Sequence, residues 1–244
     1  ELDFQIKEAQ KAGASVILAV GRRLPGWPEC HEPDWAKNLS KEEKQKQILE
    51  YIEVTVNRYK NYENIKYWQV ENEPYLTFFS RATCGQLDDS FFKKEIDLVK
   101  SVDPTRQILV TDSGEFGTWF NAYKRGDVFG TSMYLYIWNR TIGPFRYPIT
   151  PFFFKIKRNF TELFLGEKPA IVVELSTEPW LLQPIIKTPI ETQLERMGVD
   201  KFKEMINFSS KTGFDTFYLW GAEWWYWLKL NGHDELWLEA KKLF

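Results

Sequence analysis

The chain has 244 residues, of which 43% are hydrophobic and 27% are charged, and its formal net charge is −2. This length falls within the usual range of one α/β barrel domain, and the composition is typical of a globular enzyme. There is no basic stripe, no signal-peptide pattern at the start and no apolar run of the roughly 18 residues that a membrane span needs, so neither nucleic-acid binding nor membrane spanning is indicated.

The hydrophobic pattern alternates between helical and strand periods along the chain. It begins with a helix over residues 2–12 that ends at Gly13, and continues with the apolar run 15–20, which is typical of a parallel strand buried on both faces. Ser40 and Glu43 match a capping box at the start of the next helix. Further strands are expected at 65–74, 107–112, 127–138, 169–175 and 215–220, and further helices around 48–59, 92–99, 119–123, 152–165, 201–210 and 236–244.

Six strands that each precede a helix predict a parallel sheet with right-handed crossovers. No glycine-rich phosphate loop follows any strand, and polar or aromatic residues gather at the carboxyl ends of the strands. This favours a closed barrel over an open nucleotide-binding sheet. We expect a single domain over 1–244, an α/β fold of the (β/α)8 TIM-barrel type with six recognisable βα units, the third to the eighth. The extra helix at the start predicts that the N-terminus of the barrel is incomplete.

Aromatic residues make up 17% of the chain, with eleven Trp, eleven Tyr and nineteen Phe. One interpretation is a core rich in large side chains, and the other is a sugar-binding cleft in which flat indole faces pack on the pyranose ring. Several Trp residues fall just after expected strands, which favours the cleft. The candidate sugar platforms are Trp27, Trp180, Trp224 and Trp225.

Two acidic residues at strand ends are the candidate catalytic groups, because glycoside hydrolysis needs one carboxyl group that donates a proton and one that stays ionised. Glu73 directly follows a strand that should be buried, and its neighbour Asn72 can donate a hydrogen bond to a sugar hydroxyl or to the second carboxylate. The alternative for Glu73 is an ordinary surface turn. Glu174 lies within a buried strand, where a carboxylate is costly unless it is paired or lies at the barrel mouth. Its rival is Glu178, which follows in a loop and is better suited to binding substrate hydroxyls.

Other acidic residues are open to two interpretations. Asp112, Glu115 and Glu223 could each bind sugar hydroxyls, cap a helix or lie in solvent. Glu71 either tunes the pKa of Glu73 or is a polar filler.

The remaining reactive side chains do not suggest another chemistry. His31 and His233 are the only histidines, so a zinc site is not expected, and no GxSxG elbow indicates a serine hydrolase. We expect no cofactor and no metal. Cys30 and Cys84 are close enough in the expected fold for one bridge, but two free thiols are the preferred prediction.

At this point the sequence resembles a known group of enzymes. WQVENEP, which contains Glu73, looks like the Asn-Glu-Pro signature on the fourth strand of clan A glycoside hydrolases, and PAIVVELS, which contains Glu174, looks like their seventh-strand nucleophile segment. The nearest likeness is to the cellulase-like family 5. The resemblance covers nearly the whole chain in strand order, but the first two barrel strands have no counterpart.

This resemblance implies a (β/α)8 barrel and a retaining mechanism, with Glu73 as acid/base and Glu174 as nucleophile. Asn72 would bind the 2-hydroxyl of the substrate, Tyr134 would contact the nucleophile, and Trp220 would lie under the sugar at the cleaved position.

The expected function is therefore the cleavage of β-glycosidic bonds in an oligo- or polysaccharide by double displacement. One alternative is a carbohydrate-binding barrel that cannot turn over, and another is a transglycosylase that uses the same residues. The loop over 139–151 is expected to shape the specificity. The substrate class favours an extracellular or cell-envelope location.

Overall fold

The computed structural model of the protein describes residues 1–26, 29–30, 32–76 and 83–244. Trp27 and His31 therefore lie outside the described residues. The chain divides into two compact units, unit 1 over Glu1–Gly130 and unit 2 over Thr131–Phe244, and each is described by itself.

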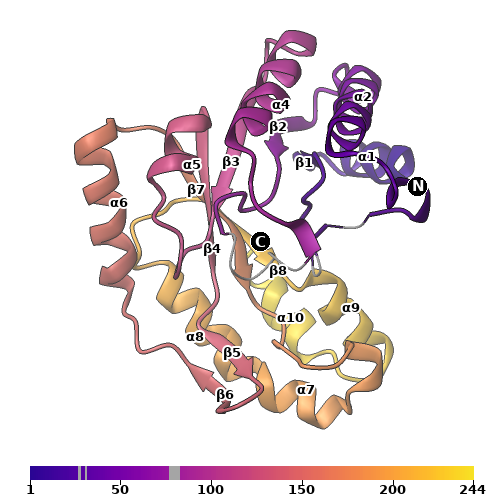
Figure 1. Ribbon diagram of the computed structural model, residues 1–244. Coiled ribbons are helices and arrows are strands. Elements are labelled where there is room, and N and C mark those ends of the chain that lie inside the picture. The colour runs from indigo at the N-terminus through magenta and orange to yellow at the C-terminus, as the bar shows by residue number, and fades with distance from the viewer. Residues whose placement is uncertain (27–28, 31, 77–82) are drawn as a thin grey trace. The chain divides into compact units, whose positions relative to one another are not determined.

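Unit 1 is built on parallel strands that alternate with helices (Figure 1). The strand β1 (Val16–Val20) pairs with β2 (Ile65–Val70), and β2 pairs with β3 (Gln107–Asp112). The helices are α1 (Leu2–Lys11), α2 (Lys41–Tyr59), α4 (Asp89–Val102) and α5 (Phe120–Arg125), with a short 3-10 helix η1 (Asp34–Ala36). The strand β4 (Val128–Met133) begins in unit 1 and ends in unit 2.

The long helix α2 begins where the sequence predicts it. Ser40 Oγ accepts a hydrogen bond from the Glu43 N–H at 3.2 Å, and the Glu43 carboxylate accepts one from the Ser40 N–H at 2.8 Å, which completes the capping box. The buried face of the helix contains Ile52, Val56 and Tyr59, as the helical spacing predicts. This face packs beside α4, which in turn contacts β2 (Figure 1).

Unit 2 contains the parallel pair β7 (Ala170–Ser176) and β8 (Phe217–Trp220). Its helices are α6 (Pro151–Leu165), α7 (Ile190–Arg196), α8 (Val199–Ser209), α9 (Ala222–Leu230) and α10 (Glu235–Lys241), with a 3-10 helix η2 (Ile185–Lys187). The helix α8 packs on β7, and α10 packs on α8 and α9. The sequence predicts α6, α8 and α10 but not α7 and α9.

The expected strand over 127–138 is wrong, because the chain breaks it after Met133. The second part, β5 (Tyr136–Asn139), pairs in antiparallel fashion with β6 (Gly143–Arg146) and forms a hairpin outside the parallel strands. Aromatic and β-branched residues fill both parts, so the hydrophobic pattern alone does not mark the break.

The expectation of two free thiols is also wrong. Cys30 and Cys84 form a disulfide with a Cα–Cα distance of 5.2 Å, across 54 residues of sequence. The two cysteines meet because one lies in the segment after β1 and the other in the segment after β2, and these parallel strands are neighbours. The guanidinium of Arg22 adds a second link by donating to the Cys84 carbonyl at 3.1 Å.

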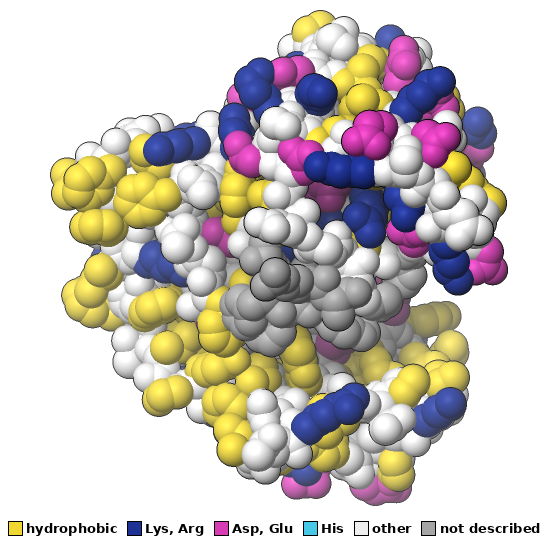
Figure 2. All heavy atoms as spheres, viewed as in Figure 1, with side chains coloured by type: hydrophobic (Ala, Val, Ile, Leu, Met, Phe, Trp, Pro, Cys, Tyr) yellow, Lys and Arg dark blue, Asp and Glu magenta, His cyan; other side chains and the backbone are white. Residues whose placement is uncertain are grey.

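An exposed apolar face is a feature of α6. Figure 2 shows hydrophobic side chains gathered over the region where α6 lies in Figure 1. The exposed residues on this helix are Phe152, Ile156, Phe160, Leu163 and Phe164. Within the described part of the chain, no helix has the length and apolar character that crossing a membrane requires.

Candidate active site

Glu73 lies in a tight turn directly after β2. The strand ends at Val70 rather than at the expected residue 74, and both Glu71 and Glu73 adopt positive φ angles, of 58° and 41°. The Glu73 N–H donates to Thr111 Oγ1 on β3 at 2.8 Å, and the residue is only 7% exposed. A left-handed backbone is unfavourable for glutamate, and such strain is concentrated at functional sites, where surrounding contacts maintain it. The prediction that Glu73 is more than a surface turn residue agrees with its burial.

Asn72 is held by several hydrogen bonds in the same turn. Its Oδ1 accepts from Gln69 Nε2 at 3.1 Å and from Thr111 Oγ1 at 3.4 Å, and its backbone N–H donates to the Arg23 carbonyl at 2.7 Å. The amide oxygen is therefore already bonded, so Asn72 would meet a sugar hydroxyl through its NH2 group.

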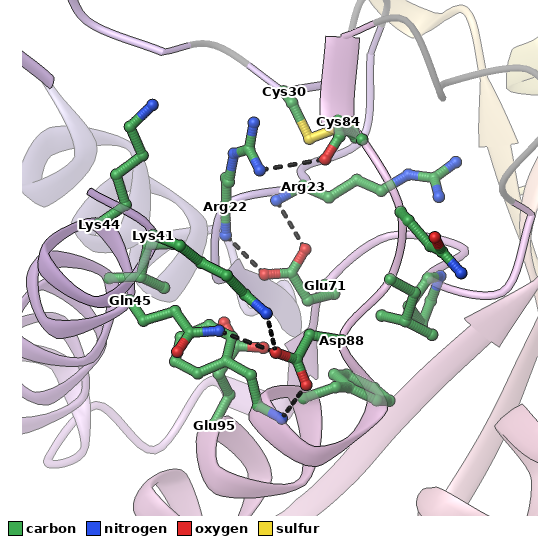
Figure 3. A pocket seen from close by; sticks show the side chains of 17 residues that line it. Arg22, Arg23, Cys30, Lys41, Lys44, Gln45, Glu71, Cys84, Asp88 and Glu95 are labelled. Atoms are coloured by element: carbon green, nitrogen blue, oxygen red, sulfur yellow. Dashed lines mark hydrogen bonds and ion pairs between the residues drawn. A yellow bond between two sulfur atoms is a disulfide. The ribbon is translucent and has the colours of Figure 1, made fainter. Parts of the chain in front are cut away.

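Glu71 links the ends of β1 and β2 (Figure 3). Its carboxylate accepts hydrogen bonds from the backbone N–H groups of Arg22 at 2.6 Å and Arg23 at 2.7 Å. At Gly21, which has a φ of 115°, a Cβ atom would lie 2.4 Å from Glu71 Oε1, so only glycine fits there. Glu71 is therefore a structural acceptor rather than a simple polar filler.

A second buried carboxyl group, Glu95 on α4, hydrogen-bonds to Glu71. Burial, and next the negative charge of Glu71, raise the pKa of Glu95 to about 11. Burial also raises the pKa of Glu71, against the effect of the hydrogen bonds that it accepts from Glu95, Arg22 and Arg23. We conclude that the proton of this pair resides on Glu95 at neutral pH, since both oxygens of Glu71 already accept N–H groups.

Unit 2 holds Glu174 at an irregular point of β7. In the pairing of β7 with β8, Val172 faces Phe217 and Leu175 faces Leu219, so β7 contains one extra residue between these points. Such bulges re-aim a side chain and are frequent beside active sites. Glu174 is 8% exposed, and its Oε2 accepts a hydrogen bond from the Tyr134 hydroxyl at 2.7 Å. The contact between Tyr134 and Glu174 that the resemblance implies is therefore present.

Glu178 has a different environment from Glu174. Its Oε1 accepts a hydrogen bond from the indole N–H of Trp220 at 2.8 Å. Burial raises the pKa of Glu178, the Trp220 hydrogen bond lowers it, and the charge of Glu223 raises it further. Glu223 itself is exposed in the first turn of α9, where an acidic residue favours the helix. Within the described ranges, Glu223 makes no capping hydrogen bond to α9, and its role in binding sugar hydroxyls stays a prediction.

The Trp residues predicted to be sugar platforms differ in how exposed their side chains are. Trp180 is 42% exposed, and its ring meets the Tyr134 ring edge-on at a centroid distance of 5.5 Å. Trp224 and Trp225 are buried, at 3% and 4% exposure, and their indole N–H groups donate to Gln193 Oε1 and to a backbone carbonyl. Their burial does not support the platform prediction, because neither can present a ring face to a sugar.

The Asp112 carboxylate accepts hydrogen bonds from two backbone N–H groups. Its Oδ1 accepts from the Ser113 N–H at 3.0 Å and its Oδ2 from the Trp119 N–H at 2.9 Å, so the carboxylate holds the segment between β3 and α5. Among the described residues, no group of three or more His, Cys, Asp or Glu side chains could hold a metal ion.

Comparison with known families decides the classification. The family described as "Glycosyl hydrolases family 2, TIM barrel domain" matches residues 5–174 of the chain, a span that contains both Glu73 and Glu174. The chain belongs to this glycoside hydrolase family 2. The expected TIM-barrel fold and the expected clan A membership are confirmed, whereas the likeness to family 5 in particular is not supported.

Three solved structures of similar fold are distant in sequence from this family 2 chain. The GH53 catalytic domain of Ignisphaera aggregans matches with a TM-score of 0.61 and 19% identity, over 91% of this chain and 66% of that one. A β-galactosidase from Halorubrum lacusprofundi matches with a TM-score of 0.56 and 13% identity, over 90% and 44%. A β-D-glucuronidase from Dictyoglomus thermophilum matches with a TM-score of 0.53 and 19% identity, over 88% and 35%. The family 2 chain thus spans about a third of the length of that glucuronidase. No curated protein sequence matches it.

Two features of the family 2 site were not predicted. One is Glu95, which lies three residues after Phe92 on the apolar stripe of α4. An acidic residue at a position that the helical spacing places on the buried face is the signal that could have identified it. The bulge in β7 was not predicted because it is defined by the pairing with β8, which the residue pattern of one strand does not record.

Proposed function

We propose that this chain is the catalytic barrel of a retaining glycosidase that cleaves β-glycosidic bonds in an oligo- or polysaccharide, with Glu73 as acid/base and Glu174 as nucleophile. The main support is that two buried carboxyl groups lie toward the carboxyl ends of parallel strands in a family 2 barrel domain. In TIM-barrel enzymes this end carries the active site.

The mechanism is a double displacement. Glu174 attacks the anomeric carbon while Glu73 gives its proton to the departing oxygen, so that a glycosyl ester forms on Glu174 and the bond to the leaving group breaks. Glu73 then takes a proton from a water molecule, which attacks the same carbon, releases the sugar and restores the Glu174 carboxylate. This sequence requires the two carboxyl groups to lie about 5–5.5 Å apart.

Position and the Tyr134 contact support Glu174 over Glu178 as nucleophile. Glu174 lies within β7, and its Oε2 accepts a hydrogen bond from the Tyr134 hydroxyl, which holds the carboxylate in one orientation. Glu178 lies in the segment after β7, and burial raises the pKa of its carboxyl group. Glu178, with Trp220 bonded to it, is better suited to contacting substrate hydroxyls beside the reacting carbon.

The sugar is to be sought first among the substrates named for structures of similar fold. One of these is a β-galactosidase and another a β-D-glucuronidase. Aryl β-galactosides and aryl β-glucuronides should therefore be tested first as substrates, followed by β-linked glucans and mannans.

Trapping the covalent intermediate tests the proposal directly. A 2-fluoro β-glycoside of the sugar that is turned over should label Glu174, and Glu174→Ala should abolish turnover, whereas Glu167→Gln, which changes an exposed loop residue, should leave it intact. Labelling of Glu178 would transfer the nucleophile role to that residue. Saccharide binding without turnover by the unaltered chain would favour a carbohydrate-binding barrel, and products elongated on acceptor sugars in preference to hydrolysis would favour a transglycosylase.

A further inference from the structure

A cavity in unit 2 is lined by several cationic side chains. It has a volume of about 220 Å³ and is formed by the β5–β6 hairpin, the segment after β7 and the helices α7 and α8. Among the described residues that line it, three are cationic and none is acidic. The lining residues are Tyr136, Ile137, Pro144, Phe145, Arg146, Trp180, Arg196 and Lys201.

Aromatic rings and carbonyl groups hold two of these cations in place. The Arg196 guanidinium lies over the Trp138 ring, 4.7 Å from its centroid, and Lys201 Nζ lies 5.2 Å from the centroid of the Tyr136 ring. Lys201 Nζ also donates to the carbonyl of Glu195 at 2.7 Å. These contacts orient the cations but do not neutralise their charge.

Acidic neighbours balance this charge only in part. Glu204 accepts from Arg146 at 2.7 Å and also from the Tyr136 hydroxyl, which neutralises one cation. Glu195 lies 3.4 Å from Arg196, but its side chain is 66% exposed, and such a solvent-exposed pair contributes little. The Nε atom of Arg196 is buried and has no hydrogen-bond acceptor in the described part of the chain. Because this atom is closed to solvent, a ligand in the cavity would meet the terminal N–H groups of Arg196 rather than Nε, and its negative charge would stabilise the guanidinium.

The cavity lies next to the candidate nucleophile but is separate from it. Trp180 lines the cavity and contacts the ring of Tyr134, whose hydroxyl donates to Glu174. A chain of two aromatic contacts thus links the cavity to the carboxylate. Under the proposed function, we infer that a group in the cavity belongs to a sugar neighbouring the one that Glu174 attacks. The volume is below the roughly 300 Å³ at which whole-ligand pockets begin, and therefore suits one substituent or one sugar.

We propose that this cavity binds an acidic group, a carboxylate or a sulfate ester, on the carbohydrate substrate. This inference rests on the proposed glycosidase function for its biological meaning. Arg196 would supply paired N–H donors, and Lys201 and Arg146 would add positive charge, which is the chemistry that recognises carboxylate and sulfate oxygens. The β5–β6 hairpin then determines which polysaccharides the enzyme accepts.

Binding to the unaltered chain tests this assignment without depending on turnover. The probes are matched monosaccharides: glucuronate with glucose, galacturonate with galactose, and galactose 6-sulfate with galactose. The titration is followed by NMR at the Arg196 Nε–H resonance, which is assigned by its loss in Arg196→Lys. We expect the acidic sugars to bind at least about tenfold more tightly than their neutral partners, and the preference to fall as salt rises. Whether the sulfated sugar or the carboxylated sugars bind with the higher affinity identifies which acidic group the cavity recognises.

Two variants separate a role of the cavity from a general effect of charge. Arg196→Gln should remove the preference for acidic sugars, measured by calorimetry on protein with an unchanged circular dichroism spectrum, and Arg196→Lys should restore part of it. Arg140→Gln, which removes an exposed charge at the tip of the same hairpin, should retain the preference. Equal affinity for acidic and neutral sugars, or a preference that survives in Arg196→Gln, would overturn the assignment. Failure of both Glu174 and Glu178 to become labelled would overturn the proposed function and leave this result unaffected.

Discussion

The hydroxyl group of Tyr134 donates a hydrogen bond of 2.7 Å to Oε2 of Glu174. Tyr134 directly follows β4, and Glu174 lies at the bulge of β7, so two strands supply the two partners. This bond orients the carboxylate, and under the proposed mechanism it would lower the cost of reaching the geometry in which Glu174 attacks. The same tyrosine contacts Trp180 and so connects the candidate nucleophile to the cationic cavity.

Tyr134→Phe should weaken catalysis without abolishing it. The variant removes one hydrogen bond to a charged group and retains the ring that packs against Trp180. Such a bond contributes about 1.5–3 kcal/mol, so we expect kcat/KM to fall roughly 10- to 100-fold. Steady-state kinetics on an aryl β-glycoside measure this, with Tyr226→Phe, an exposed tyrosine on α9, as the matched control. An unchanged kcat/KM in Tyr134→Phe would contradict the assigned role of the hydrogen bond.

Glu95→Gln should change how stability depends on pH. The folded-state pKa of Glu95 is about 11, above the ordinary value of 4.5, so the folded protein binds this proton more tightly than the unfolded chain does. The free energy of unfolding should therefore fall as pH rises between these two values, by at most about 1.4 kcal/mol per pH unit. Glutamine cannot ionise and can still donate to Glu71, so the variant should lose this slope and be more stable than the unaltered chain at alkaline pH.

Urea denaturation at pH 5, 7 and 9 measures the effect of Glu95→Gln. Glu71→Gln is the matched control, because it removes one of the two oxygens that accept the N–H groups of Arg22 and Arg23. That variant should be less stable than the unaltered chain at neutral and alkaline pH. If Glu95→Gln is destabilised at pH 9 as strongly as Glu71→Gln, Glu95 does not carry the proton of the pair.

The sequence predicts where the parallel strands of both units lie, because each contains an apolar segment between turn or helix signals. β3 has the predicted bounds, and β7 differs from its prediction by one residue at each end. The prediction fails where tertiary contacts decide the structure. The break after Met133, the disulfide and the burial of Trp224 all depend on which distant segments meet, and a local pattern does not record this.

The sequence also predicts part of the candidate site. The strand-end positions of Glu73 and Glu174 follow from the apolar runs before them, and the contact from Tyr134 follows from the family resemblance. The positive φ of Glu73 could not be anticipated, since glutamate gives no sign of a left-handed backbone. The cationic cavity could not be anticipated either, because Arg146, Arg196 and Lys201 come from three separate elements.

The Cys30–Cys84 disulfide should make a large contribution to stability. It closes a loop of 54 residues, and in the chain-entropy description a cross-link of this span stabilises the folded state by about 4 kcal/mol at 25 °C. The double variant Cys30→Ser/Cys84→Ser should therefore unfold at a markedly lower urea concentration, and a reducing agent should shift the unaltered chain to the same midpoint. If the midpoint of the oxidised chain equals that of the double variant, the bridge contributes nothing to stability in solution.

Glu73→Ala should separate the two steps of the proposed mechanism. Without the acid, a leaving group that needs a proton departs slowly, but a nitrophenolate leaves readily unaided, so the loss in the first step should be small for nitrophenyl glycosides and large for natural disaccharides. Without the base, water attacks the glycosyl ester on Glu174 slowly, so this intermediate should accumulate as a burst of nitrophenol. Azide, which needs no deprotonation, should restore turnover and give a β-glycosyl azide, since two displacements retain the configuration. Recovery of the α-azide would show a single displacement and would reject the nucleophilic role of Glu174.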